Sequence, residues 1–212
     1  MAGLPPEGVA IRIRKRIPLQ AGLAGGSADA AGVLTALNLL TDARLDSDTL
    51  AEAGAMVGAD VPFCLTGGAA LCTGTGAIVS PLPSMPDCRV VVAKPVCGVS
   101  TAEAYRRLDS TELRRRPHTS VATDAVCAGD LPAIGRELCN VFEEAIPLPE
   151  TEAIRRIMRE HRTLGCLMSG SGSAVYGLFD DREAARQCAE ALRRETEEVF
   201  LCRPCPHGPT EL

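Results

Sequence analysis

The chain has 212 residues, of which 46% are hydrophobic and 23% charged, a composition that supports one large domain or two small ones with a buried core. Aromatic residues make up only 3%, tryptophan is absent and the net charge is −5, which argues against a nucleic-acid-binding surface. No apolar run approaches the roughly 20 residues of a membrane span, and the first residues lack the apolar core of a signal peptide. We expect a soluble, cytoplasmic protein.

The ten cysteines stand singly along the chain, mostly inside apolar stretches. Without a secretion signal, we expect free buried thiols rather than disulfides. Cys202, Cys205 and His207 form one tighter cluster, but zinc needs about four ligands and no second pair has a matching spacing. We therefore predict no metal site and interpret the cluster as ordinary strand and tail residues.

The first predicted elements are a strand and a helix separated by glycines. In residues 8–17 apolar residues alternate with arginines, which predicts a half-buried strand. Residues 27–40 have one broad apolar face, which predicts a helix. Ser27 is the expected N-cap, because its hydroxyl can accept from a free first-turn amide, and Asp29 suits the positive helix end.

The next elements lead to a domain boundary. We expect a second helix at 47–57 and then strand structure from 61 to 79, with turns at the glycines. Residues 81–87 hold three prolines in a short polar stretch, and they are the predicted boundary between two domains.

The second half alternates between strands and helices, which predicts an α+β sandwich. Its Arg114–Arg116 run is interpreted as a solvated face. The expected elements are a buried strand at 88–95, helices at 100–109, 122–145 and 149–162, a strand–turn–strand unit at 166–180, a helix at 181–195 and a last strand at 199–205.

The most informative motif lies between the first predicted strand and helix: Pro18, Leu19, Gln20, Ala21, Gly22, Leu23, Ala24, Gly25, Gly26, Ser27 and Ala28. Glycines allow positive φ and remove side chains, so successive amides can converge on an anion, and the following helix N-terminus adds free N–H groups. The spacing matches neither the P-loop nor the GxGxxG pattern. The motif favours phosphate binding, and a tight structural turn is the alternative.

Two further features carry possible chemistry. Asp60 stands in GADVPF, where a predicted helix ends and a predicted strand begins. It is either a turn-forming residue or a general base in a partly desolvated site, and its spacing does not choose between them. Ser169, Gly170, Ser171 and Gly172 form either a hairpin turn or a second backbone loop packed against a nucleotide.

Taken together and in this order, PLQAGLAGGSADAA and SGSGSAVYGLF resemble the second and third motifs of the GHMP kinases. The segments KRIPLQAGLAGGSADAAGVLTALNLL, GADVPF and VSTAEAY are most similar to the 4-diphosphocytidyl-2-C-methyl-D-erythritol kinase family of that superfamily. The resemblance covers essentially the whole chain. It implies an α+β fold with a partial ribosomal-S5-like ATP-binding domain at 1–82 and a ferredoxin-like domain at 83–212.

The resemblance also implies an activity. Members of the family phosphorylate 4-diphosphocytidyl-2-C-methyl-D-erythritol at its 2-hydroxyl, with ATP and Mg²⁺, in the non-mevalonate (MEP) pathway to isopentenyl diphosphate and terpenoids. The implied location is the bacterial cytoplasm, with no nucleic-acid or membrane partner. Another GHMP kinase, acting on homoserine or mevalonate, and a non-catalytic nucleotide-binding module are the alternatives.

Site residues follow from the same resemblance, position by position. Residues 18–28 would bind the ATP phosphates through backbone amides, Lys15 would lie near the adenine, and Asp60 would take the proton from the attacking hydroxyl. Residues 169–172 would brace the nucleotide site, and Thr101 would help to line the substrate pocket. No metal ligand is assigned.

The sequence departs from the family pattern at its start. In the family, a catalytic lysine and cytidine-contacting residues lie in an N-terminal segment with an AKINL-like strand and a GYH-like turn, and neither is found here. The two lysines, Lys15 and Lys94, do not stand in that context. We therefore expect Met1 to be a late start or a fragment boundary, and the chain to turn over far more slowly than a version extended upstream.

Overall fold

The computed structural model describes residues 8–210 and divides into two compact units. The described part of unit 1 comprises 8–16, 24–84 and 205–210, and unit 2 comprises 17–23 and 85–204. The first seven residues of the predicted domain 1–82 and the last two of the predicted domain 83–212 lie outside the described residues. The boundary after residue 82 stays a prediction. Within the described part, no helix is long and apolar enough to span a bilayer.

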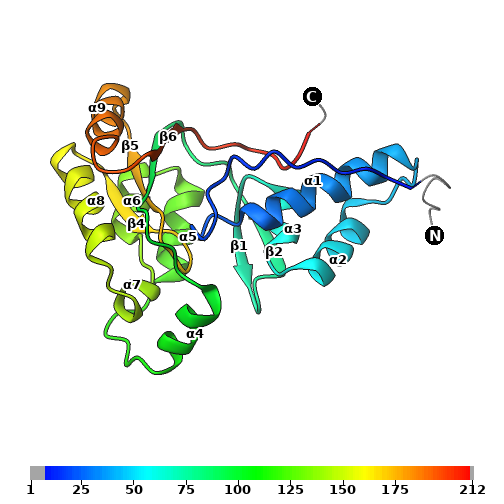
Figure 1. The fold of residues 1–212 in the computed structure, drawn as a ribbon, viewed down its shortest axis with the longest axis horizontal. Coiled ribbons are helices and arrows are strands. Elements are labelled where there is room, and N and C mark those ends of the chain that lie inside the picture. Colours follow the sequence, from blue (N-terminus) through cyan, green and yellow to red (C-terminus); the bar gives the residue numbers. More distant parts are fainter. Residues whose placement is uncertain (1–7, 211–212) are drawn as a thin grey trace. The chain divides into compact units, whose positions relative to one another are not determined.

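Unit 1 contains helices and one β-hairpin (Figure 1): α1 (Gly25–Leu40), α2 (Ser47–Val57), α3 (Val61–Thr66), β1 (Ala69–Thr73) and β2 (Ile78–Leu82). The predicted second helix is confirmed. Helix α3 packs on both α1 and α2. A Cβ added at Gly54 of α2 would lie 3.0 Å from the Val61 side chain, so the two helices approach closely at this point.

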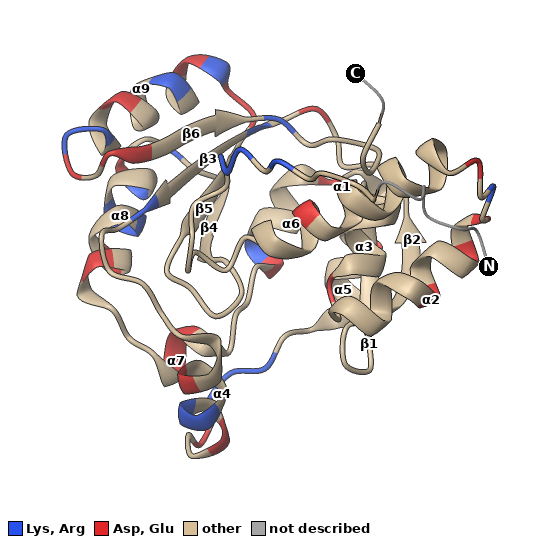
Figure 2. Cartoon of the chain, turned by 45° about the vertical axis from the view of Figure 1, so that its right-hand side comes forward, with Lys and Arg blue, Asp and Glu red and all other residues tan. Residues whose placement is uncertain are grey.

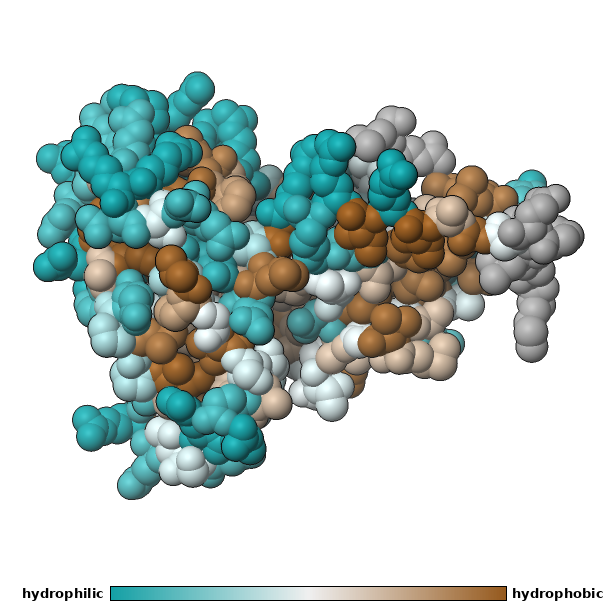
Figure 3. Space-filling model, in the orientation of Figure 1, coloured by the Kyte–Doolittle hydropathy of each residue, from teal (hydrophilic) through white to brown (hydrophobic). Residues whose placement is uncertain are grey.

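The predicted strand at 8–17 is wrong: these residues have no regular secondary structure. A strand needs a hydrogen-bonded neighbour, and no strand within residues 8–210 pairs with this segment. Its residues 9–14 instead line an open groove of about 450 Å³ together with α1. Ile11 and Ile13 stay 57% and 54% exposed, and Figure 3 shows hydrophobic surface on this part of the chain.

Two local predictions in unit 1 are also wrong. Helix α1 begins at Gly25 rather than at Ser27, and its N-cap residue is Ala24, with a φ of 48° and no side-chain capping bond. Residues 61–66 are helical rather than extended, because Pro62 is well suited to a first helical turn. The strand structure starts only at Ala69.

Unit 2 is built on a four-stranded antiparallel sheet in the order β4-β5-β3-β6. This order and the strand–helix–strand–strand–helix–strand succession define the ferredoxin-like fold that was predicted. The elements are β3 (Arg89–Lys94), α4 (Thr101–Asp109), α5 (Thr119–Ala128), α6 (Leu131–Glu137), α7 (Phe142–Ala145), α8 (Pro149–Glu160), β4 (Gly165–Met168), β5 (Val175–Phe179), α9 (Arg182–Leu192) and β6 (Glu198–Cys202).

Most elements of unit 2 confirm the prediction, but the expected helix at 122–145 is interrupted. Gly129 ends α5 with a φ of 65°, and Asp130 then caps α6 by accepting from the Ala133 amide. A left-handed glycine after a helix and an aspartate before one are ordinary helix-end signals. The continuous apolar pattern of residues 122–145 led to the prediction of one helix in spite of them. Arg114–Arg116 are exposed, as predicted.

Helices pack on both faces of this sheet. Val175 and Phe179 of β5 pack with α8 and α9, whereas Leu178 packs with α5 and α6 on the opposite face. Figure 2 shows acidic and basic residues close together on α8 and α9. On α9, Arg186 and Glu183 form an exposed ion pair at 2.6 Å. Such exposed ion pairs contribute little to stability, so the stability of the unit comes mainly from its three buried apolar clusters.

The cysteines are all free, but the prediction that they are buried holds only in part. Cys88 and Cys188 are buried in two of the three apolar clusters of unit 2. Four others are exposed: Cys72, Cys127, Cys202 and Cys205. These four cysteines lie in apolar stretches of the sequence but at the surface of the structure. The residue pattern alone does not distinguish such surface positions from buried ones.

Candidate nucleotide-binding site

The glycine-rich segment has an unusual alternating backbone. Every second residue, Gln20, Gly22 and Ala24, has a left-handed φ, of 53°, 70° and 48°. Alternation of right- and left-handed residues turns successive N–H groups toward one side and forms an anion-binding concavity. Helix α1 begins directly afterwards, and the amides of its first turn have no acceptor within the helix.

Within unit 2, three consecutive carbonyl groups of this segment are held by protein donors. The Ser169 hydroxyl donates to the Gly22 carbonyl at 2.8 Å. The Ala174 amide donates to the Ala21 carbonyl at 3.1 Å, and the Ser173 amide to the carbonyl of Gln20 at 3.3 Å. Within unit 2, the amides of Gln20, Ala21 and Gly22 donate to no residue outside the turn at 17–23. The carbonyls of this segment are therefore occupied by protein donors.

The close approach of these two segments requires glycine at positions 22 and 170. A Cβ at Gly22 would lie 2.0 Å from the Ser169 carbonyl oxygen, and one at Gly170 would lie 3.1 Å from the Gly22 oxygen. The two predicted loops therefore pack backbone against backbone. The structure thus brings together residues 20–22 and 169–172.

The segment that leads into α4 joins the same arrangement. Thr101 Oγ1 lies 3.2 Å from Ser171 Oγ, and the Ser173 hydroxyl donates to the Cys97 carbonyl. A Cβ at Gly98 would lie 2.4 Å from the Gln20 side-chain oxygen. Thr101 is thus a neighbour of the 169–172 loop.

Both lysines are engaged in ion pairs within their own units. Lys15 of unit 1 pairs with Asp29 on α1, and these two side chains are 28% and 29% exposed. Lys94 is buried in unit 2, where its Nζ donates to the Pro95 carbonyl at 3.0 Å and lies 3.4 Å from a Glu198 carboxylate oxygen. Lys15 thus lies next to the helix that follows the glycine-rich segment.

Asp60 lies at a different kind of boundary from the predicted one. It separates α2 from α3 rather than a helix from a strand, and it is exposed rather than partly desolvated. It occupies the N-cap position of α3, yet its carboxylate accepts no capping hydrogen bond. Burial and then the negative charge of Asp60 raise the pKa of the Cys64 and Cys72 thiols.

The Cys205 and His207 cluster has close contacts but not the surroundings of a metal centre. Cys205 Sγ lies 3.8 Å from His207 Nδ1 and 3.4 Å from the His207 carbonyl oxygen. In the part of the chain that the structure describes, no three His, Cys, Asp or Glu side chains are grouped to hold a metal.

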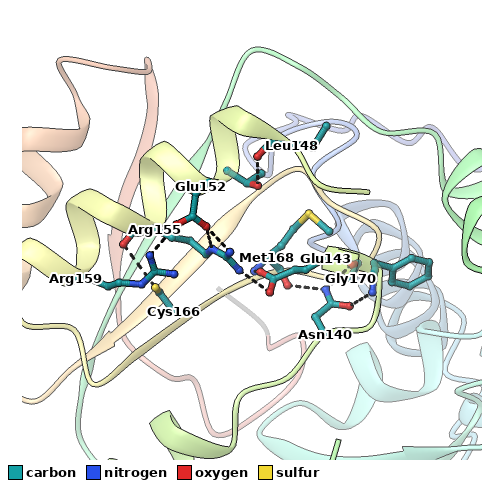
Figure 4. A network of polar contacts seen from close by, with 11 residues as sticks. Asn140, Glu143, Leu148, Glu152, Arg155, Arg159, Cys166, Met168 and Gly170 are labelled. Carbon is teal, nitrogen blue, oxygen red and sulfur yellow. Dashed lines mark hydrogen bonds and ion pairs between the residues drawn. The ribbon is translucent and has the colours of Figure 1, made fainter. Parts of the chain in front are cut away.

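Two residues that the sequence did not single out bind the 169–172 loop and the residue before it through side-chain hydrogen bonds (Figure 4). Asn140 Nδ2 donates to the carbonyls of Met168 and Gly170, each at 2.8 Å. Glu143 of α7 accepts from the Met168 amide at 2.8 Å. In the sequence, Asn140 falls inside the helix predicted at 122–145, and only the long-range contacts seen in the structure distinguish it.

Comparison with known proteins agrees with this arrangement. Residues 1–68 match the family model of the GHMP kinases N terminal domain, and residues 122–198 match that of the GHMP kinases C terminal domain. A homoserine kinase structure from Cytophaga hutchinsonii shares the fold, with a TM-score of 0.75 at 22% identity over 92% of this chain and 70% of the other. These matches define the class as the GHMP kinases.

Relatives with higher sequence identity indicate which GHMP kinase family the chain belongs to. A 4-diphosphocytidyl-2-C-methyl-D-erythritol kinase of Caldicellulosiruptor saccharolyticus is 43% identical over 201 residues, 94% of this chain and 69% of that protein. One from Geobacillus kaustophilus is 46% identical over 93% of this chain and 68% of that protein. A crystal structure of 4-(cytidine 5'-diphospho)-2C-methyl-D-erythritol kinase matches with a TM-score of 0.73 at 37% identity, over 89% of this chain and 68% of the other. The chain belongs to the 4-diphosphocytidyl-2-C-methyl-D-erythritol kinase family.

Proposed function

We propose that the protein transfers the γ-phosphoryl group of ATP to the 2-hydroxyl of 4-diphosphocytidyl-2-C-methyl-D-erythritol, a step of the MEP pathway to isopentenyl diphosphate. The observation that carries this proposal is the 43% identity to a kinase of that name over 94% of the chain. The likeness to homoserine kinase, at 22% identity, supports the fold alone. A cytoplasmic location accords with the proposal.

Phosphate binding is assigned to residues 18–28. Phosphoryl transfer depends mainly on positioning and on neutralising the charge of the transferred group. The amides of Gln20, Ala21 and Gly22 and the first turn of α1 would supply uncharged donors for this purpose. The Ser169 hydroxyl and the amides of Ser173 and Ala174 keep those donors in place by binding the carbonyls of the same segment, and Lys15 is assigned to the adenine end of the nucleotide.

Proton transfer is assigned to Asp60. Its exposed carboxylate, which caps no helix amide, would orient the attacking hydroxyl and accept its proton as the new oxygen–phosphorus bond forms and ADP leaves. Thr101, beside Ser171, is proposed to contact the alcohol substrate.

Mg²⁺ is proposed to enter with ATP. The ion usually keeps several waters and uses one or two carboxylates together with substrate phosphates. We assign the ion no protein ligand. When bound, the ion neutralises phosphate charge.

The test is a phosphoryl-transfer assay with γ-labelled ATP and a panel of alcohols. We expect label transfer to 4-diphosphocytidyl-2-C-methyl-D-erythritol and none to homoserine, mevalonate or the same methylerythritol without its cytidine diphosphate. Equal or faster transfer to homoserine or mevalonate would replace the proposed substrate. ATP binding without transfer to any alcohol would support a non-catalytic nucleotide-binding module.

A further inference from the structure

We infer that Asn140 is a positioning residue of the nucleotide site, acting through the loop at 169–172 on the backbone of residues 20–22. This inference rests on the proposed function, because it assigns the effect to ATP binding. All the contacts that carry it lie within unit 2.

The first step is the geometry of the Asn140 amide. Its Nδ2 donates to the Met168 and Gly170 carbonyls, and its Oδ1 accepts from the Phe142 amide at 3.0 Å. Two carbonyl acceptors require the NH₂ group, and an N–H donor requires the oxygen, so the partners determine the orientation of the amide. Asn140 therefore links the end of β4, the middle of the loop and the start of α7.

The second step connects the loop to the nucleotide segment. Ser169 stands between the two carbonyls that Asn140 holds, and its hydroxyl donates to the Gly22 carbonyl. Gly170, the second acceptor, is also the residue whose Cβ position lies 3.1 Å from the Gly22 oxygen. If Asn140 no longer bound the loop, the Ser169 hydroxyl would no longer be held in place to donate to the Gly22 carbonyl.

The third step concerns Glu143, which binds the backbone just before the loop. Glu143 accepts from the Met168 amide and pairs at 2.6 Å with Arg155 of α8, each side chain being 21% exposed. Arg155 and Arg159 also bind Glu152 on the same helix (Figure 4). The Glu143 contact anchors only the Met168 end, whereas Asn140 alone among these residues reaches Gly170.

Asn140→Asp is the informative variant, because it keeps the acceptor for the Phe142 amide while it replaces the donor with an oxygen that faces two carbonyls. Loss of two hydrogen bonds to the loop is expected to raise the Kd for ATP by about tenfold. The KM for ATP should rise similarly, while the KM for the alcohol stays within about twofold. A general loss of folded protein would not produce this selectivity.

The matched control is Asn38→Asp. Asn38 lies near the end of α1, where its amide donates to the Leu45 carbonyl at 3.1 Å and accepts from the Leu45 amide at 2.9 Å. It is 13 residues from the start of α1, about 20 Å along the helix, and so tests the same chemical change away from the loop. We expect its ATP affinity to equal that of the wild type.

Amide hydrogen exchange without nucleotide gives a second readout. Asn140→Asp should accelerate exchange in peptides covering 17–23 and 168–174, and Asn38→Asp should not. Asn140→Ser, a milder change, serves if the aspartate variant does not fold. Unchanged exchange at 17–23 together with unchanged ATP affinity would overturn the inference, as would equal losses for both substrates. If the wild type binds no ATP, the proposed function fails, and exchange at 17–23 alone decides the role of Asn140.

Discussion

The Ser169 hydroxyl donates to the Gly22 carbonyl at 2.8 Å, although the two residues are 147 positions apart in the sequence. The contact explains why two separate glycine-containing loops are needed. One loop presents backbone amides, and the other binds the carbonyls that would otherwise need their own partners. If the segment binds a ligand, this contact can affect its affinity without the Ser169 side chain touching the ligand.

Ser169→Ala should weaken ATP binding by about fivefold, because it removes one neutral hydrogen bond worth about 1 kcal/mol. Calorimetric titration measures this change. Ser110→Ala is the control, since the Ser110 hydroxyl donates to the Arg107 carbonyl at 2.9 Å in an exposed position at the end of α4. Equal affinities for the wild type and Ser169→Ala would show that the hydrogen bond does not support the nucleotide site.

Asp60→Asn should lower kcat by about 10²–10⁴-fold while leaving the Kd for ATP within about twofold, because only proton acceptance is removed. Its melting temperature should stay unchanged, since the Asp60 side chain caps no amide. The measurement is steady-state phosphorylation of the proposed alcohol.

Asp46→Asn is the control for this charge change. Asp46 caps α2 by accepting from the Thr49 amide at 2.9 Å, a role that asparagine also fills. We expect full activity for this variant. Full activity in Asp60→Asn as well would exclude Asp60 from proton transfer.

The raised pKa of Cys188 predicts that the free energy of unfolding falls at alkaline pH. Burial, and then the neighbouring Cys166, raises the pKa of the Cys188 thiol from 9.0 to about 12. The unfolded chain therefore loses this proton before the folded protein does. The stabilising contribution is fully present below pH 9 and is lost as the pH rises toward 12, with a slope of at most about 1.4 kcal/mol per pH unit.

Denaturant unfolding of the wild type and Cys188→Ala between pH 8 and 11 under reducing conditions tests this point. The variant should be less stable at pH 8, because it leaves a cavity, but its free energy of unfolding should fall less steeply above pH 9. Parallel curves for the two proteins would mean that Cys188 ionises equally easily in both states.

Sequence reasoning succeeded where the signal is local. The strand predicted at 88–95 and the alternation of strands and helices in the second half follow from patterns within a few residues. The ferredoxin-like fold was expected from the family resemblance. The contact between Gly22 and Ser169 agrees with a bracing role that came only from the family resemblance.

Sequence reasoning failed where a partner elsewhere in the chain decides the outcome. Residues 8–17 alternate like a strand but find no strand to pair with in the described part of the chain. Asn140 carries no local sign of its contacts, because its two acceptors lie 28 and 30 residues away. Such contacts depend on how strands and loops meet in space, which residue patterns do not encode.

The most direct test of the phosphate-binding assignment is a comparison of ATP and adenosine affinity in Gly22→Ala and in the wild type. A Cβ at Gly22 would lie 2.0 Å from the Ser169 carbonyl oxygen at a φ of +70°, so the loop must move. Gly32→Ala is the control, because a Cβ at this position of α1 meets nothing within 4 Å and should stabilise the helix by about 0.5–1 kcal/mol.

Calorimetric titration of the three folded proteins gives the answer. If the backbone of residues 20–22 binds the phosphates, the wild type and Gly32→Ala should bind ATP at least about tenfold more tightly than adenosine, and Gly22→Ala should lose most of that preference. Equal affinities of the wild type for ATP and adenosine, or an undiminished preference in Gly22→Ala, would contradict the assignment.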